Sequence, residues 1–417
     1  MKKIVTIWWG NGQSNLLDGM QRYFPKKKYH ISSIVSMSDD GRTTGELMRK
    51  FQEELGLHLP PPGDLRRCLF MMSNSSRKNE FQQFLETVIE RDMIISELTI
   101  WDYFRLVGAD DDFKMYLERC TRKMINSLPL SPYGARWIPL EAGERAPWGG
   151  KVGIEGVSRE KCNFLSFTLP LTSSIKGHKV GNILMANLYY NFEKDYYKML
   201  EVMHALLEVE ADIIPVTTQK AYIRAILWNG EVIETQDRIS NVASYTAGIA
   251  DLELMEDSRY AYQHKSVFKA LRKADYIIIT PGDVFTSIIS NFVIGWVKEV
   301  IHKSDAKIIY IWNSTNKWWE TQWLTHLDII SKIERFLWKS IDIFICNNTK
   351  LDLSPEEKSR FQSHVSVKGW DYLYLSRGER KELEARKVKI FETALLDKKS
   401  LYKHDTKVLT ELLEKIM

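Results

Sequence analysis

Short apolar runs along the chain repeatedly end in polar or glycine-rich segments. Runs of this length without glycine or proline predict strands that are buried on both faces, as in a parallel sheet. Helical patterns follow most of them, so we expect an α/β protein with a Rossmann-like, doubly wound, mostly parallel sheet and helices on both faces. The five runs span residues 3–9, 31–37, 275–279, 307–312 and 341–346.

One segment departs from this pattern. Residues 129–162 contain four prolines and six glycines and show no helical or strand period. We interpret 129–162 as an irregular or small β insertion, for which a plain surface insertion is favoured over a lid. Residues 1–128 and 163–417 are then expected to form one α/β core. Its charged tail, 383–417, reads as helical, with an apolar stripe at Val408, Leu412 and Ile416 that docks on the core.

Composition narrows the class of protein. The chain has 417 residues, of which 44% are hydrophobic and 27% charged, as in a globular protein with a large core. A formal net charge of +4 gives no support for a nucleic-acid partner. No run of 18 apolar residues exists, so we expect no membrane span. The four cysteines form no CxxC pair, which favours reduced thiols in a cytoplasmic protein.

The richest polar corner follows the second apolar run. Asp39 and Asp40 end that run and lead into a flexible turn. Three prolines then precede a second corner, where Gly63, Asp64 and Arg66 are held stiffly because proline restricts its neighbours. Each corner alone is more often a structural turn. Together they favour a ligand crevice, in which carboxylates suit ribose hydroxyls, a flavin-like ring or Mg²⁺.

Three other corners have the same character. The segment after the first run leads into a helix, an arrangement that presents backbone N–H groups to phosphate, although it lacks the GxGxxG and P-loop patterns. His178 alone is best read as a structural histidine, but beside Gly177 and Gly181 a phosphate or ribose contact is equally favoured. The candidate ligand-binding residues at these corners are Gly10, Asn11, Gly12 and Gln13; His178 and Asn182; and Thr280, Pro281, Gly282, Thr286 and Ser287, with Asn313 after the next run.

No Ser/His/Asp or Cys/His arrangement accompanies these corners. Backbone donors and hydroxyls suit phosphates, and carboxylates suit ribose or Mg²⁺. The residues therefore predict a nucleotide or a nucleotide-linked ligand.

In these corners the sequence resembles the CofD/YvcK superfamily, in matching order across most of the chain. The most specific match is LPPPGDLRRCL at 59–69, which resembles the family's LPPPGDIRNCL. Its PPPGD form and the closing motif are similar to the YvcK-like branch. The other matches are SDDG at 38–41 with Thr44-Gly45 (family ADDGGSSG), Gly177-His178 with Gly181-Asn182 (GHSLGNLLL), 280–289 (GPGSLYTSI) and 402–405 (RHDPEKL).

The sequence also departs from the family pattern. The family's GGGTG loop is Trp9-Gly10-Asn11-Gly12-Gln13 here, and Asp283 and Phe285 replace the Ser and Tyr of GPGSLYTSI. A lost hydroxyl and an added charge near the expected phosphates weaken or re-specify binding.

The resemblance implies a cytoplasmic protein that binds a nucleotide or nucleotide sugar. In the YvcK-like branch the implied role is regulatory, coupling a UDP-sugar signal to carbon metabolism, the cell envelope and cell shape. The alternative is a CofD-like transferase that moves a phospholactyl-type group from a nucleotide diphosphate to a flavin-like acceptor with Mg²⁺. A scaffold that has lost its ligand is a third reading.

The two active readings assign roles to the corner residues. Mg²⁺, held by Asp39 and Asp40, is the one expected cofactor, and we expect no permanently bound organic cofactor. A homodimer is compatible with the sequence, which identifies no interface. Phosphates are assigned to Gly10, Asn11, Gly12, Thr280, Pro281, Gly282, Thr286 and Ser287, and the base, ribose or acceptor to Asp39, Asp40, Asp64, His178, Asn182 and Asn313.

Overall fold

The chain folds into two compact units. Unit 1 comprises residues 1–48, 63–72 and 211–417, and unit 2 comprises 49–62 and 73–210. This division differs from the single core expected from the sequence, and the predicted insertion at 129–162 lies outside the described residues. The computed structural model describes residues 1–8, 11–127, 164–241, 247–313, 318–321, 324–348, 354–357, 359, 374–397 and 403–417.

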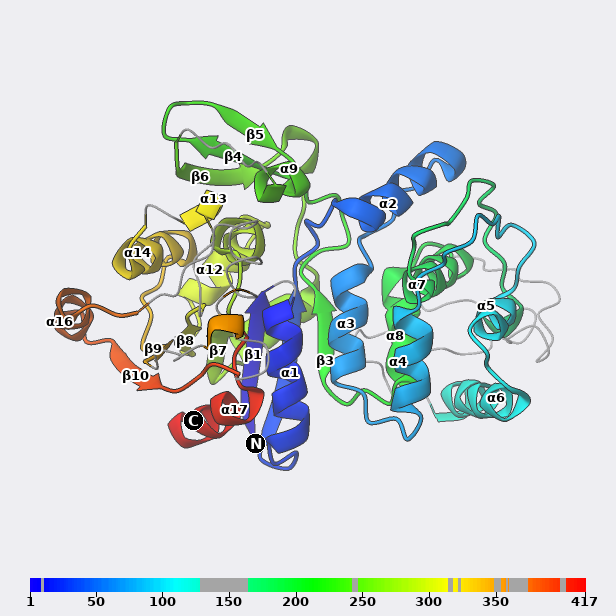
Figure 1. The fold of residues 1–417 in the computed structure, drawn as a ribbon, viewed down its shortest axis with the longest axis horizontal. Helices are drawn as coiled ribbons and strands as arrows, with labels where there is room; N and C mark the ends of the chain where they lie inside the picture. The colour runs from blue at the N-terminus through cyan, green and yellow to red at the C-terminus, as the bar shows by residue number, and fades with distance from the viewer. Residues whose placement is uncertain are drawn as a thin grey trace, which may run out of the picture. The chain divides into compact units, whose positions relative to one another are not determined.

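Unit 1 is built on a seven-stranded sheet in the order β10-β9-β8-β7-β1-β2-β3 (Figure 1). Every neighbouring pair is parallel. The chain leaves the central β1 toward β2 and β3, and later returns beside β1 to build β7 to β10 in the other direction. This is the doubly wound order that the apolar runs predict. The strands are β1 Lys2–Trp8, β2 Tyr29–Val35, β3 Asp212–Pro215, β7 Tyr276–Ile279, β8 Lys307–Ile311, β9 Ile343–Asn347 and β10 Lys389–Thr393.

The inner strands form because their side chains are apolar on both faces. All five residues of β9 are buried, as are the last four of β8. When helices cover both faces of a strand, its apolar side chains are removed from water on both sides. This burial stabilises a continuous run of Ile and Phe.

Helices cover both faces of the sheet. On one side α17, α1 and α3 pack together and lie side by side in Figure 1. α10, α12 and α14 form a second packed group. The helices of unit 1 are α1 Asn11–Tyr23, the first half of α2 Arg42–Leu55, α3 Gly63–Met71, α9 Gln236–Asn241, α10 Lys265–Arg272, the π-helix η4 Val284–Ile289, α11 Ser290–Phe292, α12 Val297–His302, α13 Trp318–Thr321, α14 His326–Leu337, α16 Arg377–Ala385 and α17 Thr406–Ile416, with the 3₁₀ turn η3 Glu256–Ser258.

A second, three-stranded antiparallel sheet belongs to unit 1, with order β5-β4-β6. Its β4–β5 hairpin turns at Asn229-Gly230, where Gly230 has φ +84°. The strands are β4 Ile223–Leu227, β5 Val232–Glu234 and β6 Ile249–Leu254.

Unit 2 is helical, with an aromatic core. Phe84 and Phe104 stack with ring centroids 3.6 Å apart, and Phe113 lies 5.5 Å from Phe104. In the described parts of the chain no helix is long and apolar enough to cross a membrane. The elements of unit 2 are the second half of α2, α4 Lys78–Glu86, α5 Ile100–Leu106, α6 Asp111–Ser127, the 3₁₀ turn η2 Phe164–Ser166, α7 Val180–Asn191 and α8 Tyr196–Leu206.

Two details of the tail differ from the sequence prediction. Residues 389–393 form β10, an edge strand, within a segment read as helical. In α17 the buried residues are Leu409, Thr410 and Leu413, so the buried leucines lie one position beyond the predicted stripe, and Val408 and Leu412 are half-buried.

Candidate ligand-binding site

The carboxyl ends of the central strands lie level with one another. Trp8 pairs with Val35 of β2, and Ile7 pairs with Ile279 of β7. Because the connections run in opposite directions from β1 and β7, the sheet has its topological switch point between these two strands. Ligands of doubly wound sheets bind in the crevice outside this point. The corners after β1, β2, β7 and β8 therefore border the candidate site.

The corner after β1 is a helix N-terminus. Trp9 and Gly10 lie outside the described residues, and α1 begins at Asn11. Gln13 is fully buried, and its Nε2 donates to Ser33 Oγ and to Thr6 Oγ1. Its amide thus ties α1 to β1 and β2. Contact between Gln13 and a ligand stays a prediction.

The corner after β2 holds Asp39 and Asp40, both half-buried. Asp39 Oδ1 accepts the Gly41 amide at 3.2 Å, and the Thr44 hydroxyl also hydrogen-bonds this carboxylate. Arg42, which follows Gly41, has φ +48°, a left-handed backbone conformation that is strained for a residue other than glycine. The strain is located directly beside the two carboxylates.

Asp40 is tied to another element of unit 1. Its Oδ1 accepts the backbone amide of Asp237, in the first turn of α9, at 2.8 Å. Gly45 makes this arrangement possible, since a Cβ on Gly45 would lie 1.9 Å from the Asp40 carbonyl oxygen. Asp40 therefore fixes the corner to α9.

The proline corner brings α3 against the β2 corner. A Cβ on Gly63 would lie 3.3 Å from Thr44 Oγ1 and 3.9 Å from Asp39 Oδ2, so glycine permits the approach. Asp64 follows and is only 6% exposed. Its Oδ1 accepts Arg67 Nη1 at 3.1 Å, and its buried Oδ2 has no hydrogen-bond partner. The structure thus brings together Asp39, Gly63 and Asp64, as predicted from the two corners.

These carboxylates bind protons more tightly than usual. Burial raises the pKa of Asp64 to about 7, with Arg67 opposing the shift and Asp39 adding to it. Burial also raises the pKa of Asp40 to about 6, although the Asp237 amide opposes this, and raises the pKa of Asp39. Arg66, 1% exposed in the same helix, also favours the ionised form of Asp64. A concentration of buried carboxylates with raised pKa is typical of a functional site.

The corner after β7 contains three buried hydroxyls, of which two lack a hydrogen-bond partner and one is bonded to Glu320. Thr280 Oγ1 and Ser287 Oγ are buried and have no hydrogen-bond partner. Thr286 Oγ1 instead donates to Glu320 Oε1 at 2.7 Å, and the Phe285 amide donates to Glu320 Oε2 at 3.2 Å. Glu320, 1% exposed, therefore caps the N-terminus of η4 with its carboxylate.

Asn313 completes this side of the site. It follows β8, and its Nδ2 donates to the Gly282 carbonyl at 2.7 Å. This bond joins the β8 corner to the Pro281-Gly282 turn. It links the predicted residues Gly282 and Asn313 directly, and Thr280 and Ser287 belong to the same β7 corner.

His178 and Asn182 belong to unit 2. Both are buried, and His178 Nε2 lies 3.4 Å from Lys50 Nζ. The Lys50 ammonium also donates to the Ser174 carbonyl. The His178 carbonyl accepts the Ile89 amide at 2.9 Å. These contacts hold the loop before α7 in place within unit 2, and a ligand contact of His178 or Asn182 stays a prediction.

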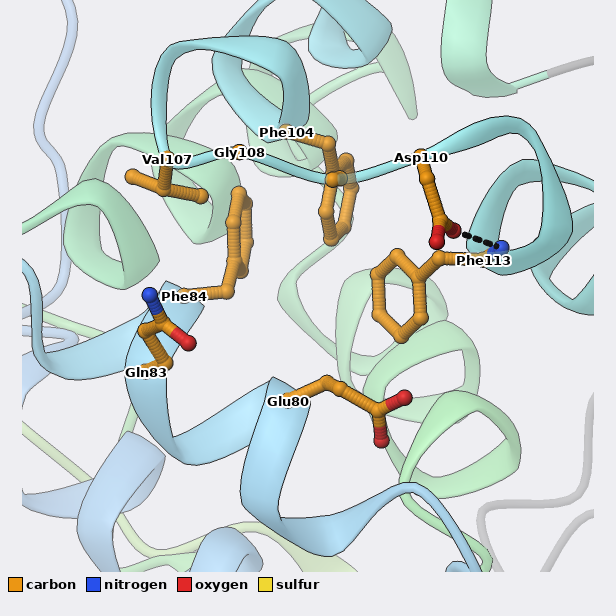
Figure 2. Close-up of a pocket in the computed structure, with 9 residues that line it drawn as sticks. Glu80, Gln83, Phe84, Phe104, Val107, Gly108, Asp110 and Phe113 are labelled. Carbon is orange, nitrogen blue, oxygen red and sulfur yellow. Dashed lines mark hydrogen bonds between the residues drawn. The ribbon is translucent and has the colours of Figure 1, made fainter.

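A cavity of about 90 Å³ in unit 2 is a different kind of feature (Figure 2). It lies beside Phe84, Phe104 and Phe113, with Glu80 and Asp110 at its rim. Asp110 Oδ1 accepts the Phe113 amide at 2.8 Å, and Glu80 pairs with Arg77. The carboxylates of Glu80 and Asp110 therefore already have partners within the protein, and none of the corner residues lines the cavity. It is a gap in the aromatic core of unit 2.

The carboxylates of the β2 corner could supply part of the coordination shell of Mg²⁺. Within the described residues, no three His, Cys, Asp or Glu side chains are grouped as a metal site would need. Mg²⁺ is commonly held by one or two carboxylates and completed by phosphate and water oxygens. Asp39, with Asp40 beside it, would supply that part of the shell.

Sequence reasoning missed Glu320, Asp237, Thr44 and Arg67. Glu320 lies 34 positions from Thr286, and Asp237 lies 197 positions from Asp40. No local pattern marks such partners. Thr44 and Arg67 lay within the quoted motifs, and the i, i+3 spacing of Asp64 and Arg67 in a helix was a usable signal.

The fold is that of a doubly wound α/β protein, and its candidate ligand site is bordered by carboxylates with raised pKa and by buried hydroxyls without partners. Residues 4–396 match the family model described as 2-phospho-L-lactate transferase CofD. The chain belongs to this CofD/YvcK family.

Relatives and a solved structure agree with this placement. A protein of Listeria innocua named gluconeogenesis factor is 20% identical over 87% of this chain and 84% of its own. A protein of Thermoanaerobacterium thermosulfurigenes, provisionally given that name, is 24% identical over 99% and 95%. A crystal structure of a UPF0052 family member from Bacillus halodurans has a TM-score of 0.68 at 18% identity, covering 99% of this chain and 100% of that one.

Proposed function

We propose that this protein binds a nucleotide sugar of the UDP-sugar type at the carboxyl edge of the unit 1 sheet. Its role would be regulatory and cytoplasmic, linking that ligand to carbon metabolism, the cell envelope and cell shape. The observation that carries the proposal is the pair of buried, unpartnered hydroxyls of Thr280 and Ser287 beside the switch point. A buried hydroxyl without a hydrogen-bond partner lowers stability, and phosphate oxygens would supply the missing acceptors.

The rest of the corner set supports a division of roles. The N-terminus of α1 and the Thr280–Gly282 turn would hold the phosphates through backbone N–H groups. Asp39 and Asp64 would face the ribose or the sugar as acceptors. The names of the relatives favour regulation over catalysis.

The test is thermal unfolding with a panel of nucleotides and nucleotide sugars, with and without Mg²⁺. A ligand at 100 times its dissociation constant adds about 2.7 kcal/mol to the free energy of unfolding. We expect a UDP-sugar to raise the melting temperature without Mg²⁺. The double variant Asp39→Ala/Asp40→Ala, if folded, should respond less, and an unchanged affinity would remove these residues from the site. If no nucleotide stabilises the protein, the proposal fails and a scaffold without ligand replaces it.

A second candidate is phosphoryl-group transfer, which one observation favours. The Asp64 carboxylate has its pKa near neutrality and an oxygen without a partner. Such a group accepts a proton from an acceptor hydroxyl as that oxygen attacks phosphorus and the nucleoside monophosphate leaves. When bound at Asp39 and Asp40, Mg²⁺ would neutralise phosphate charge.

Turnover distinguishes the two candidates. A transferase releases a nucleoside monophosphate from a lactyl-phospho-nucleotide only with Mg²⁺ and a flavin-like acceptor. A sensor binds its nucleotide sugar and releases no product.

A further inference from the structure

Unit 1 carries a patch of exposed aromatic side chains that the ligand site does not use. Tyr262, Trp296 and Trp338 are 49%, 59% and 51% exposed, and we call these three residues the aromatic patch. Tyr262 lies against the backbone beside Trp296, and Trp338 contacts the lysine that follows two positions after Trp296. A Cβ on Gly295 would lie 3.1 Å from Tyr262 Cδ1, which places the Gly295-Trp296 backbone against Tyr262. The Lys298 ammonium lies 4.5 Å from the centroid of the Trp338 ring.

The adjoining helix α10 adds positive charge. Lys265, Phe268, Lys269 and Arg272 follow the i, i+3, i+4, i+7 spacing of one helical face and point outward or lie at the surface, whereas Val267 and Leu271 are buried. Phe268 is 42% exposed between these cations. α10 packs against α12, which begins directly after Trp296.

The segment that contains α10 is basic. From residue 259 to residue 273 the chain has five Lys and Arg residues and no Asp or Glu. The whole chain has a net charge of only +4, so this short segment is locally far more basic than the average. An anionic partner is therefore electrostatically complementary to it.

We propose that the aromatic patch and the outer face of α10 bind the surface of an anionic phospholipid membrane. Large rings between lysines suit the boundary of headgroups and acyl chains, where ring and lysine stem meet hydrocarbon and the ammonium meets phosphate. Phe268 offers no hydrogen bond, so its exposure is best compensated by apolar contact. A nucleic acid or an acidic protein would match the charge but would leave these rings without hydrocarbon to enter.

The experiment is co-sedimentation with phosphatidylcholine vesicles that contain phosphatidylglycerol, compared with pure phosphatidylcholine. The full chain should partition to the anionic vesicles, and increasing salt should release it. Neutralising Lys265, Lys269 and Arg272 to Gln should lower the partition coefficient roughly 100-fold. Trp296→Ala and Trp338→Ala should each lower it with the fold intact by circular dichroism.

Matched controls come from the same unit. Trp228→Ala removes a tryptophan that is 69% exposed on the β4–β5 hairpin, and Lys27, Lys407 and Lys415 to Gln remove three other exposed cations. These variants should partition like the parent. Equal loss in controls and patch variants would overturn the proposal. So would failure to bind anionic vesicles, binding of RNA but not vesicles through the same residues, or a Trp296→Ala effect seen only as dissociation of a dimer by light scattering.

Discussion

At the scale of residues, the site is defined by polar atoms that the protein leaves unsatisfied. Asp64 has one oxygen paired with Arg67 and one buried oxygen without a partner. The hydroxyls of Thr280 and Ser287 are likewise buried and have no hydrogen-bond partner. Unsatisfied polar groups of this kind lower the stability of the free protein, and a ligand that forms the missing hydrogen bonds would offset that loss.

Asp64→Asn should reveal this cost through its pH dependence. The folded pKa of about 7 lies above the usual carboxyl range, so the native state holds the extra proton between about pH 4 and pH 7. The contribution of Asp64 is therefore most favourable at acid pH and is lost as the pH rises through 7. Asn keeps the oxygen that accepts from Arg67 and adds no charge. Urea unfolding should find the variant more stable at pH 8, by at most about 4 kcal/mol, with the difference gone near pH 4.

Asp305→Asn, at an exposed carboxylate, serves as the matched control for the substitution itself. A difference between Asp64→Asn and the parent that stays constant from pH 4 to pH 8 would refute the raised pKa.

Glu320 should be required for the shape of the β7 corner. Glu320→Ala leaves the Phe285 amide and the Thr286 hydroxyl without an acceptor, which should cost about 2–4 kcal/mol in the free energy of unfolding. Glu320→Gln retains one acceptor oxygen and should lose less. Denaturant unfolding measures both, with the exposed Glu411→Ala as reference. If Glu320→Ala is as stable as that reference, the capping role is wrong.

At the scale of elements, the strands with continuous apolar runs were predictable, whereas β10 and β6 were not. β7, β8 and β9 are buried on both faces, and their sequence shows it. β10 lies at the sheet edge, where its residues are half-buried or exposed, so its alternation is masked by the charged helices around it. β6 pairs only within the small sheet and carries no continuous run, and no element was predicted there.

The docking of α17 was predicted with its face displaced by one residue. Leu413 is fully buried, whereas Leu412 is half-buried. Leu413→Ala should therefore lower the free energy of unfolding by about 3 kcal/mol, because it removes contacts and leaves a cavity against α1. Leu412→Ala should cost less than half of that. Thermal unfolding of the two variants measures the difference. A larger loss of stability for Leu412→Ala than for Leu413→Ala would show that the assigned buried face of α17 is wrong.

At the scale of the whole molecule, the corners were predictable because strand ends and glycine turns are local signals. Gly63 lies against Asp39, and Asn313 bonds to Gly282, whereas the contact of these residues with a ligand stays a prediction. The division into two units was not, because unit 2 interrupts unit 1 twice and its boundary at Met48–Arg49 falls inside helix α2. Such a boundary depends on long-range packing and leaves no mark in composition. The partners Glu320 and Asp237 were missed for the same reason.

The central claim is that phosphates of a nucleotide reach the hydroxyls beside the switch point. Calorimetric titration of UDP-glucose and of GDP into the parent, Thr280→Val and Ser287→Ala tests it most directly. Val keeps the shape of Thr280 without its hydroxyl, and Ser304→Ala, a buried serine whose hydroxyl donates to the Leu271 carbonyl, is the control. We expect at least one of the two compounds to bind and each site variant to weaken it about tenfold, as the loss of a phosphate hydrogen bond predicts. Parent-like affinity in both site variants would place the nucleotide elsewhere and contradict the account.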